Sequence, residues 1–526
     1  MIKTDIKLNL KYRECDIAEA IRLSLPMENE EIKDAHLIKR TLVIKDTERP
    51  YYKCTVAFST GSEKEAGLLK MRKRVSPYDA PGMPPVPYKG KGRPVVVGAG
   101  PSGLFCALYL AECGARPILL ERGGDVKERV KRVSLFNTLG VLDPECNVQF
   151  GEGGAGTFSD GKLKVGGHDK YKDKVLLELI SAGADGTVFY SDTAHVGTDR
   201  LPSIMENIRE RIISLGGEVY FGAKFTRPLL NNGITVGLEY EMGGNKYELL
   251  TDNLVLAIGH SARDTIRALY SQGVHMEPKG FGIGMRVEHP REYINRLVYG
   301  EHTAQIEDTA SYHLVTHLPS GRSVYSFCMC PGGTVVAATG QEGSVVTNGM
   351  SESRRMGDNS NAAILVSATP EDFPDSTPLG GIALQEQIER LAYGLTSEYK
   401  APCCSLSDIM SGGSTATLPD VMPSYGRGTE LVSPRKYLPD FVTDSLQGGF
   451  SDFDAWMDGF SIGGAALTGP ETRTTSPVKM TRTETREALG ISGLYPVGEG
   501  AGYAGGIISS AQDGLRTAEA IVNKYL

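Results

Sequence analysis

The sequence lacks the features of a membrane-spanning, secreted or disulfide-stabilised protein. No stretch approaches the roughly 20 consecutive apolar residues that cross a bilayer. The first residues, Met1 to Ile6, include a lysine but no apolar run behind it, so we expect no signal peptide. The nine cysteines are irregularly spaced, and a chain of 526 residues is large enough to fold without disulfides. We therefore expect a cytoplasmic protein with reduced thiols.

Several catalytic motifs and an excess of positive charge are also missing. The chain contains no His-Glu-x-x-His and no P-loop. Its 56 Lys and Arg against 64 Asp and Glu give a formal net charge of −8. Neither nucleic acid nor an anionic membrane surface attracts such a chain overall. We expect a small-molecule substrate, and neither a membrane nor a nucleic acid as partner.

Composition and periodicity indicate an α/β protein with four segments. Residues 1–75 alternate like strands around a helical stretch and predict a small α/β domain. Residues 76–91 are rich in proline and predict an extended linker. Segments 92–265 and 485–526 each contain a strand, a glycine turn and a helix, and we expect them to form one Rossmann-like domain. Residues 266–484 show strands with turn signals, which predicts an inserted, mostly β substrate domain.

The first motif is a glycine-rich turn, Gly98-Ala-Gly-Pro-Ser-Gly103, between a valine strand and a helix. Its glycines permit a tight turn, close approach of the backbone to a diphosphate, and close packing of helix on strand. Glu121 follows at the end of the next strand, where a carboxylate would bind a ribose hydroxyl. Together these features predict dinucleotide binding. The candidate residues of this unit are Gly98, Gly100, Pro101, Ser102, Gly103, Glu121 and Arg122.

A second glycine-rich turn, between 498 and 507, separates a strand from the last helix. It resembles the C-terminal element with which flavoproteins of the glutathione-reductase class close their FAD site. In that class an aspartate of this element contacts the ribityl chain; here the acid is Glu499, one methylene longer, which leaves its contact open. The resemblance implies that the N-terminus of the last helix faces the flavin. The candidates are Gly498, Glu499, Gly500, Gly505, Gly506 and Ile507.

A third glycine cluster lies between Gly151 and Gly161. Its backbone N–H groups and hydroxyls are suited to an anion-binding nest, and in related flavoproteins such a loop lies along the flavin. Lys162 is a further candidate near the flavin or the diphosphate, with a solvated lysine as the alternative. The remaining candidates of this cluster are Gly153, Gly154, Gly156, Thr157 and Ser159.

Four stretches, 147–163, 282–290, 325–333 and 348–351, resemble the bacterial NAD/FAD-utilising dehydrogenases. The resemblance covers nearly the whole chain from about residue 90. It implies FAD as cofactor and NAD(P)H as an optional transient co-substrate, but it names no substrate. It also implies that three further residues lie at the FAD site, namely Phe225, Ala257 and Gly259.

The sequence does not identify the catalytic residues, and it offers only weak candidates. Arg286, Arg354 and Arg355 have the chemistry to bind an anionic substrate, although loop arginines are commonly solvated. His260 lies beside the expected FAD site or is an ordinary loop histidine. Ser261 is expected to cap a helix over 262–272.

Two cysteine pairs also require an interpretation. Cys328 and Cys330 alternate on a predicted strand, so both thiols should face one side. We expect a reduced, packed pair, with a redox-active thiol or a metal ligand as the alternatives; no matching pair of further ligands is found. Cys403 and Cys404 receive the same interpretation.

The predicted function is that of an FAD-dependent dehydrogenase or reductase. It would pass a hydride between flavin N5 and an unidentified small molecule bound between the FAD and inserted domains. No second strand–glycine turn–helix unit offers a permanent nicotinamide site. Two alternatives stay open, an RNA-modifying flavoprotein, which the acidic balance disfavours, and a non-catalytic flavin-binding or docking protein. Neither the direction of the reaction nor the oligomeric state follows from the sequence.

Overall fold

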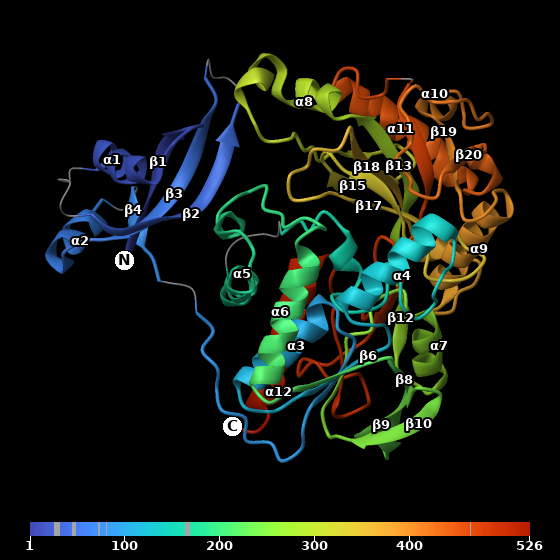
Figure 1. Cartoon of the computed structure of the whole chain (residues 1–526), viewed down its shortest axis with the longest axis horizontal. Coiled ribbons are helices and arrows are strands. Elements are labelled where there is room, and N and C mark those ends of the chain that lie inside the picture. Colours follow the sequence, from blue (N-terminus) through green and yellow to red (C-terminus); the bar gives the residue numbers. More distant parts are fainter. Residues whose placement is uncertain (26–31, 45–48, 72–73, 80–81, 164–168, 463) are drawn as a thin grey trace.

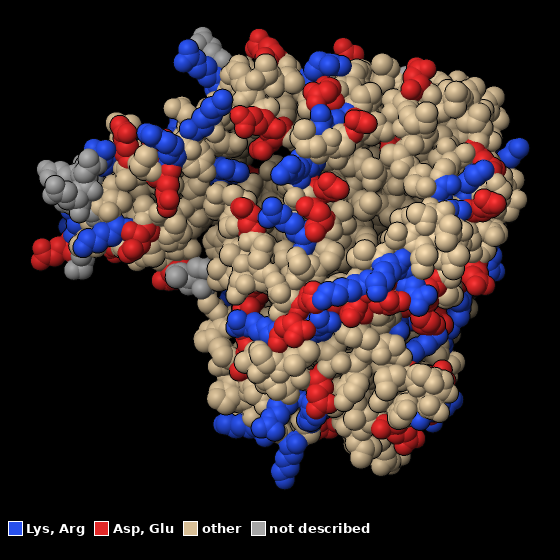
Figure 2. Space-filling view, in the orientation of Figure 1, with Lys and Arg blue, Asp and Glu red and all other residues tan. Residues whose placement is uncertain are grey.

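Figure 1 shows the computed structural model of the chain, which describes residues 1–25, 32–44, 49–71, 74–79, 82–163, 169–462 and 464–526. Parts of the expected first domain, and Ala80 and Pro81 of the expected linker, lie outside these described residues. Among the described helices, none is long and apolar enough to cross a membrane. On the face drawn in Figure 2, lysines and arginines are interspersed with aspartates and glutamates.

The N-terminal part of the chain forms a four-stranded antiparallel sheet with two helices. Its β-α-β-β-α-β succession and its strand order, β2-β3-β1-β4, are those of the ferredoxin-like fold. Alternate apolar residues bury one face of β1, and Ile2, Ile6 and Leu8 join one core with Ile17 and Ile21 of α1. The elements are β1 (Ile2–Asn9), α1 (Glu14–Ser24), β2 (Lys33–Val43), β3 (Tyr51–Ser59), α2 (Ser62–Leu69) and β4 (Val75–Pro77).

A five-stranded parallel sheet, ordered β23-β11-β5-β6-β7, supports the glycine motifs. β23 comes from the C-terminal end of the chain and pairs with β11, so distant segments of the sequence complete one sheet. Four of these strands, β5, β6, β11 and β23, are buried on both faces, which explains their largely apolar residues, whereas the edge strand β7 is partly exposed. They are β5 (Val95–Val97), β6 (Ile118–Glu121), β7 (Glu218–Phe221), β11 (Leu254–Leu256) and β23 (Leu494–Pro496).

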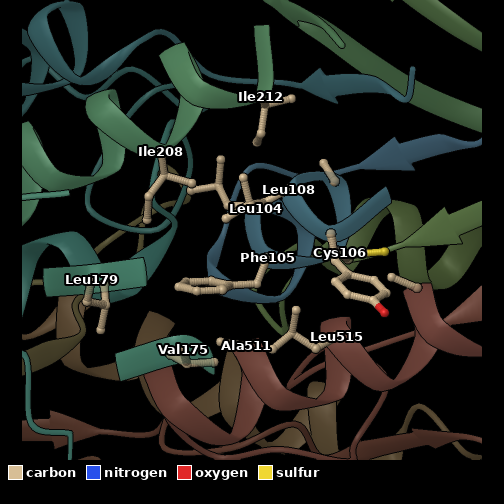
Figure 3. Packing of buried hydrophobic residues seen from close by; sticks show 14 of the residues in the cluster. Leu104, Phe105, Cys106, Leu108, Val175, Leu179, Ile208, Ile212, Ala511 and Leu515 are labelled. Carbon is tan, nitrogen blue, oxygen red and sulfur yellow. The ribbon is translucent and has the colours of Figure 1, made fainter. Parts of the chain in front are cut away.

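Helix α3, which follows the first glycine turn, is buried on nearly all sides. Leu104, Phe105 and Leu108 of this helix share one core cluster with Ile208 of α6 and Leu515 of α12 (Figure 3). A helix that is apolar all round must be covered all round, so these neighbours fix the position of α3. The helices of this region are α3 (Pro101–Glu112), α4 (Val126–Leu139), α5 (Lys170–Ser181), α6 (Leu201–Ser214) and α12 (Ile507–Asn523).

A seven-stranded sheet, ordered β14-β15-β18-β13-β21-β19-β20, is central to the region after residue 280. The expectation of a mostly β region is wrong, because the long helices α9 and α11 also belong to it. Val442, Leu446 and Phe450 of α11 have helical spacing and are buried, but a pair of glycines interrupts the pattern. A Cβ on Gly449 would lie 2.4 Å from Val324 Cγ1, so this glycine allows the helix to approach β15 closely. The elements are β13 (Phe281–Pro290), β14 (Val315–His317), β15 (Ser323–Cys330), β18 (Asn359–Ala368), α9 (Gly380–Gly394), β19 (Ala401–Ser405), β20 (Thr429–Leu431), α11 (Asp440–Trp456) and β21 (Ala466–Glu471).

Smaller elements connect these sheets. β8, β9 and β10 form an antiparallel sheet, and β12 pairs with β22 and β16 with β17. Their bounds, with those of the short helices, are β8 (Ala223–Asn231), β9 (Ile234–Met242), β10 (Asn245–Leu250), α7 (Arg263–Ser271), β12 (Met276–Pro278), α8 (Arg291–Tyr299), β16 (Thr334–Ala337), β17 (Thr347–Met350), α10 (Leu406–Met410) and β22 (Val478–Met480).

Candidate cofactor and substrate site

A cavity of about 910 Å³ lies between the carboxyl ends of the parallel strands and the seven-stranded sheet. Open α/β sheets bind their ligands at this edge. The predicted residues that line it are Gly98, Gly100, Pro101, Ser102, Glu121, Arg122, Gly154, Gly156, Ser159, Lys162, Phe225, Ala257, Gly259, His260, Cys328, Glu499, Gly505, Gly506 and Ile507. The candidates Arg355 and Cys330 also line it, and the predicted residues that do not are Gly103, Gly153, Thr157, Arg286, Arg354, Gly498 and Gly500.

The three positions of the first turn are glycine for different physical reasons. Gly98 has φ +102°, and a Cβ there would lie 2.3 Å from the carbonyl oxygen of Ala257. A Cβ on Gly103 would lie 1.8 Å from the carbonyl oxygen of Gly98. Gly100 has φ −75°, which any residue adopts, and a Cβ there would come no closer than 3.7 Å to another atom, Cα of Gly154. The fold therefore requires glycine at 98 and 103, whereas at 100 the missing side chain only leaves room in the cavity.

Two helices begin at the cavity wall. α3 starts after Gly100 and α12 starts after Gly506, and neither has a side-chain hydrogen bond capping its first turn. The Ser102 hydroxyl, at the start of α3, is buried without a hydrogen-bond partner among the described residues. Free N–H groups and the positive end of a helix dipole favour an anion such as a diphosphate. The donor set at this wall fits a dinucleotide.

Glu121 connects the glycine loops. Its carboxylate accepts hydrogen bonds from the backbone N–H groups of Ala99 at 2.8 Å, Gly123 at 2.9 Å and Gly151 at 3.0 Å. A carboxylate has about four acceptor positions, so one remains for a ligand hydroxyl. The side chain is buried at the edge of the cavity. Glu121 thus orders the site itself, a role that its position in the sequence does not indicate.

His260 and Glu499 meet in the cavity, with His260 Nδ1 3.5 Å from Glu499 Oε1. Burial raises the pKa of Glu499 to about 7 and lowers the pKa of His260 to about 3. The imidazole is therefore neutral at physiological pH, and its Nε2 has no hydrogen-bond partner among the described residues. His260 lies in the turn between β11 and α7, is 7% exposed and lines the cavity, and its role beside FAD stays a prediction.

The expected helix cap at Ser261 is also wrong. Helix α7 begins after Ala262 without a side-chain cap. The Ser261 hydroxyl instead donates to Oε1 of Gln149 at 3.0 Å and so connects two loops of the site. The tertiary contact supplies this hydroxyl with an acceptor that lies far away in the sequence.

Two of the three arginines proposed for an anionic substrate are occupied by carboxylates of the chain. Arg286 is fully buried and binds Glu471 through Nε at 2.6 Å and Nη2 at 2.9 Å. Arg355 binds Asp160 through Nε at 3.1 Å and Nη2 at 2.5 Å. Arg354 is exposed. The expectation that Arg286 or Arg355 offers a free guanidinium to substrate is therefore wrong.

The Cys328–Cys330 segment differs from a regular strand. A β-bulge interrupts the pairing of β15 with β18 between Phe327 and Cys330, and Cys328 has φ +40°. Cys328 is exposed and Cys330 is buried, and both residues line the cavity. The expected packed pair is thus wrong at Cys328, and the described residues contain no cluster that could hold a metal ion. Cys403 and Cys404 are both buried, as expected.

Sequence reasoning missed a buried arginine cluster at the edge of the cavity. Arg263 and Arg473 both bind Glu389, with Nη2–Oε1 of 2.7 Å and Nη2–Oε2 of 2.9 Å respectively. These ion pairs hold the pKa of the Glu389 carboxyl well below its usual range. Arg473 lines the cavity, and its Nη1 has no hydrogen-bond partner among the described residues. No sequence pattern connects these positions, so no signal would have found them.

The N-terminal sheet contacts a loop of the cavity wall. Arg40 of β2 donates its backbone N–H to the carbonyl oxygen of Tyr190 at 2.7 Å, and its own carbonyl oxygen accepts from Asp192 N at 3.1 Å. The Thr41 hydroxyl donates to the Asp192 carboxylate. Asp192 lines the cavity, so strand β2 positions part of its wall.

Comparison with known proteins gives one family model and one curated relative. Residues 280–474 match the family described as "FAD-dependent protein, C-terminal domain-like". An uncharacterized protein of Clostridium beijerinckii is 47% identical over 438 residues, which cover 83% of this chain and 81% of the relative.

Solved structures resemble the chain only distantly. A flavin-dependent brominase is 11% identical with a TM-score of 0.37, covering 82% of this chain and 79% of that chain. A flavoprotein/dehydrogenase from Cytophaga hutchinsonii is 11% identical with a TM-score of 0.36, covering 82% of this chain and 78% of that chain. Similarity at this level supports no conclusion about activity.

Proposed function

We propose that the chain is an FAD-dependent oxidoreductase of a small molecule. It belongs to the same family as the Clostridium beijerinckii protein and contains the C-terminal domain of FAD-dependent proteins. FAD is its cofactor. The observation that carries the proposal is the composition of one cavity. One wall has the glycine turn and helix N-termini suited to a dinucleotide. The facing wall includes residues of β15, β17 and the end of β21, together with Lys162 and Tyr312 beside β15. Such an arrangement leaves room for a substrate against the cofactor.

The residues that would hold FAD follow from the contacts described above. The turn from Gly98 to Gly103 and the N-terminus of α3 would bind the diphosphate, and the free acceptor position of Glu121 would bind the adenosine ribose. The N-terminus of α12 would lie at the isoalloxazine ring. When bound, FAD supplies the redox chemistry by accepting or donating a hydride at N5.

Glu499 is positioned to hold a proton near neutral pH. Its pKa of about 7 means that a modest change in the charge of the cavity changes its protonation at Oε1. The imidazole of His260, with Nδ1 3.5 Å from Oε1, is neutral and adds no charge beside this carboxyl. Glu499 can therefore bind or release a proton beside the residues that would hold the cofactor.

An anaerobic titration of the FAD-loaded protein tests the proposal. Purified protein, supplied with FAD if needed, is titrated first with NADPH and then with NADH while the flavin absorbance is recorded. Rapid bleaching of the flavin band would establish a reductase that is supplied by a nicotinamide. If nicotinamides leave the flavin oxidised, a panel of small-molecule donors tests the dehydrogenase direction. Reduction by dithionite alone would make the protein a non-catalytic flavin binder and refute the proposal.

A further inference from the structure

The facing wall of the cavity contains one cation that no carboxylate neutralises. The Nζ of Lys162 lines the cavity and donates to the carbonyl oxygen of Met329 in β15. Lys162 is also anchored through its backbone, by a bridge to His195. It forms an ion pair with no carboxylate of the described residues, and burial lowers its pKa. An ammonium group has three donors, so two remain after the bond to Met329.

The nearby carboxylates are already occupied. Asp160, two residues before Lys162, binds Arg355, and Glu471 binds Arg286. Asp192, at the same part of the wall, accepts the hydroxyl of Thr41. The two arginines therefore pair with Asp160 and Glu471, whereas Lys162 has no carboxylate within ion-pair distance among the described residues. A buried charge without a partner is costly, so a ligand anion would be strongly favoured there.

A second unpaired donor lies on the same wall. The hydroxyl of Tyr312 is buried and has no hydrogen-bond partner among the described residues, although Tyr312 lines the cavity. Its ring is held by an edge contact with Phe460 at 5.2 Å. Burial raises its pKa, so the hydroxyl stays protonated and can donate. Two residues after Tyr312, Leu314 is hydrogen-bonded to Ser326 of β15, and Lys162 binds the carbonyl oxygen of Met329 in the same strand, so both groups lie along β15.

We propose that the substrate is a small carboxylate, whose carboxylate group binds the ammonium group of Lys162 and accepts a hydrogen bond from the hydroxyl of Tyr312. This inference rests on the proposed function, because it assigns the facing wall of the cavity to the substrate. Lys162, and not Arg286 or Arg355, is then the residue that recognises the anion. The neighbouring ion pairs then serve to fix the wall and leave one charge for the ligand.

Difference absorbance spectra of the bound flavin test the proposal with defined probes. FAD-loaded protein is titrated with acetate, succinate and benzoate, and in parallel with acetamide, succinamide and benzamide. We expect at least one carboxylate to perturb the flavin spectrum with a dissociation constant at least about tenfold below that of its amide, since hydrogen bonds to charged groups contribute this much. Lys162→Gln should raise that constant at least about tenfold, Tyr312→Phe by a smaller factor, and Lys162→Arg should retain most of the affinity.

Controls separate binding of the anion from folding and from binding of FAD. Lys170→Gln removes an exposed lysine outside the cavity, paired with Glu519, and should leave the carboxylate affinity unchanged. The flavin content and melting temperature of each variant are measured in parallel, and Lys162→Arg and Tyr312→Phe retain a test if Lys162→Gln does not fold.

Four outcomes would overturn the proposal. They are equal affinity of amides and carboxylates, no response to any carboxylate, unchanged carboxylate affinity in Lys162→Gln, or loss of FAD from a folded Lys162→Gln protein, which would make Lys162 a cofactor ligand. Binding of carboxylates by a protein whose flavin only dithionite reduces would instead uphold this subsite and refute the proposed function.

Discussion

The side chains of Arg286 and Glu471 form a buried ion pair across the adjacent strands β13 and β21, with an Nε–Oε2 distance of 2.6 Å and an Nη2–Oε1 distance of 2.9 Å. Arg286 also donates to the carbonyl oxygen of Cys328 at 3.0 Å and to Asn361 and Asn348. This guanidinium therefore anchors the bulge that turns Cys328 into the cavity. Its role is to shape the wall.

Replacement of the carboxylate should destabilise the protein strongly. Glu471→Gln leaves the guanidinium of Arg286 buried without a counter-charge, and loss of one partner of a buried pair costs about 3–5 kcal/mol. Urea unfolding followed by circular dichroism measures the change in the free energy of unfolding. The matched control is Asp440→Asn, because Asp440 is 82% exposed where it pairs with Arg435, and such a pair contributes less than about 1 kcal/mol. Equal effects of the two substitutions would contradict the structural role of the buried pair.

The glycines of the first turn should respond differently to alanine. Gly103→Ala places a Cβ 1.8 Å from the carbonyl oxygen of Gly98 and should prevent normal folding. In Gly100→Ala the added Cβ lies no closer than 3.7 Å to another atom, so the variant without FAD should melt near the temperature of the wild-type apoprotein. Its affinity for FAD should fall at least about tenfold, because the methyl group enters the space for the diphosphate. Flavin fluorescence titration and thermal melting measure both properties, and wild-type affinity in Gly100→Ala would place the diphosphate elsewhere.

The stability of the protein should carry a pH-dependent contribution from Glu152. This side chain is fully buried, its Oε2 accepts from Val126 N at 2.9 Å, and its Oε1 has no hydrogen-bond partner among the described residues. Burial raises its pKa from 4.5 to about 7. The folded state therefore holds a proton that the unfolded state loses, and stability falls as pH rises from about 4.5 to above 7, by about 3 kcal/mol in total.

Glu152→Gln removes this titration. The melting temperature of the variant should equal or trail that of the wild type at pH 5 and exceed it at pH 8. Differential scanning fluorimetry across this range measures the crossover. A difference between the two proteins that stays constant with pH would show that Glu152 does not titrate as described.

The nine thiols should react with iodoacetamide in three classes. Cys15 is exposed and should be labelled first. Cys328 is exposed toward the cavity, whose protein walls desolvate the thiol and raise its pKa to about 12, so its thiolate fraction at pH 8 is about a thousandfold below that of an ordinary thiol. The other seven cysteines are buried and should react only after unfolding. Mass spectrometry of timed digests measures the order, and labelling of Cys328 as fast as Cys15 would contradict the raised pKa.

The cofactor could be predicted from the sequence because each element that binds it is formed by residues close together in the chain. A glycine turn between a strand and a helix occupies about six residues, and the φ of Gly98 and the close contact of Gly103 are set within that turn. The alternation of apolar and polar residues along a strand is likewise a property of neighbouring residues. By contrast, α11 was missed because Gly448 and Gly449 weaken its helical pattern. Only tertiary contacts explain these glycines, since Gly448 faces Leu318 and Gly449 faces Val324.

The sequence by itself therefore determined the cofactor and the turns that receive it, while the tertiary structure decided which charged groups remain free for a substrate. Arg286 and Glu471 are 185 positions apart, and Asp160 and Arg355 are 195 apart. Such pairs form wherever folding brings opposite charges together out of water, since an unpaired charge is costly there. Lys162 is left without a carboxylate partner among the described residues, because the arginines have already bound Asp160 and Glu471.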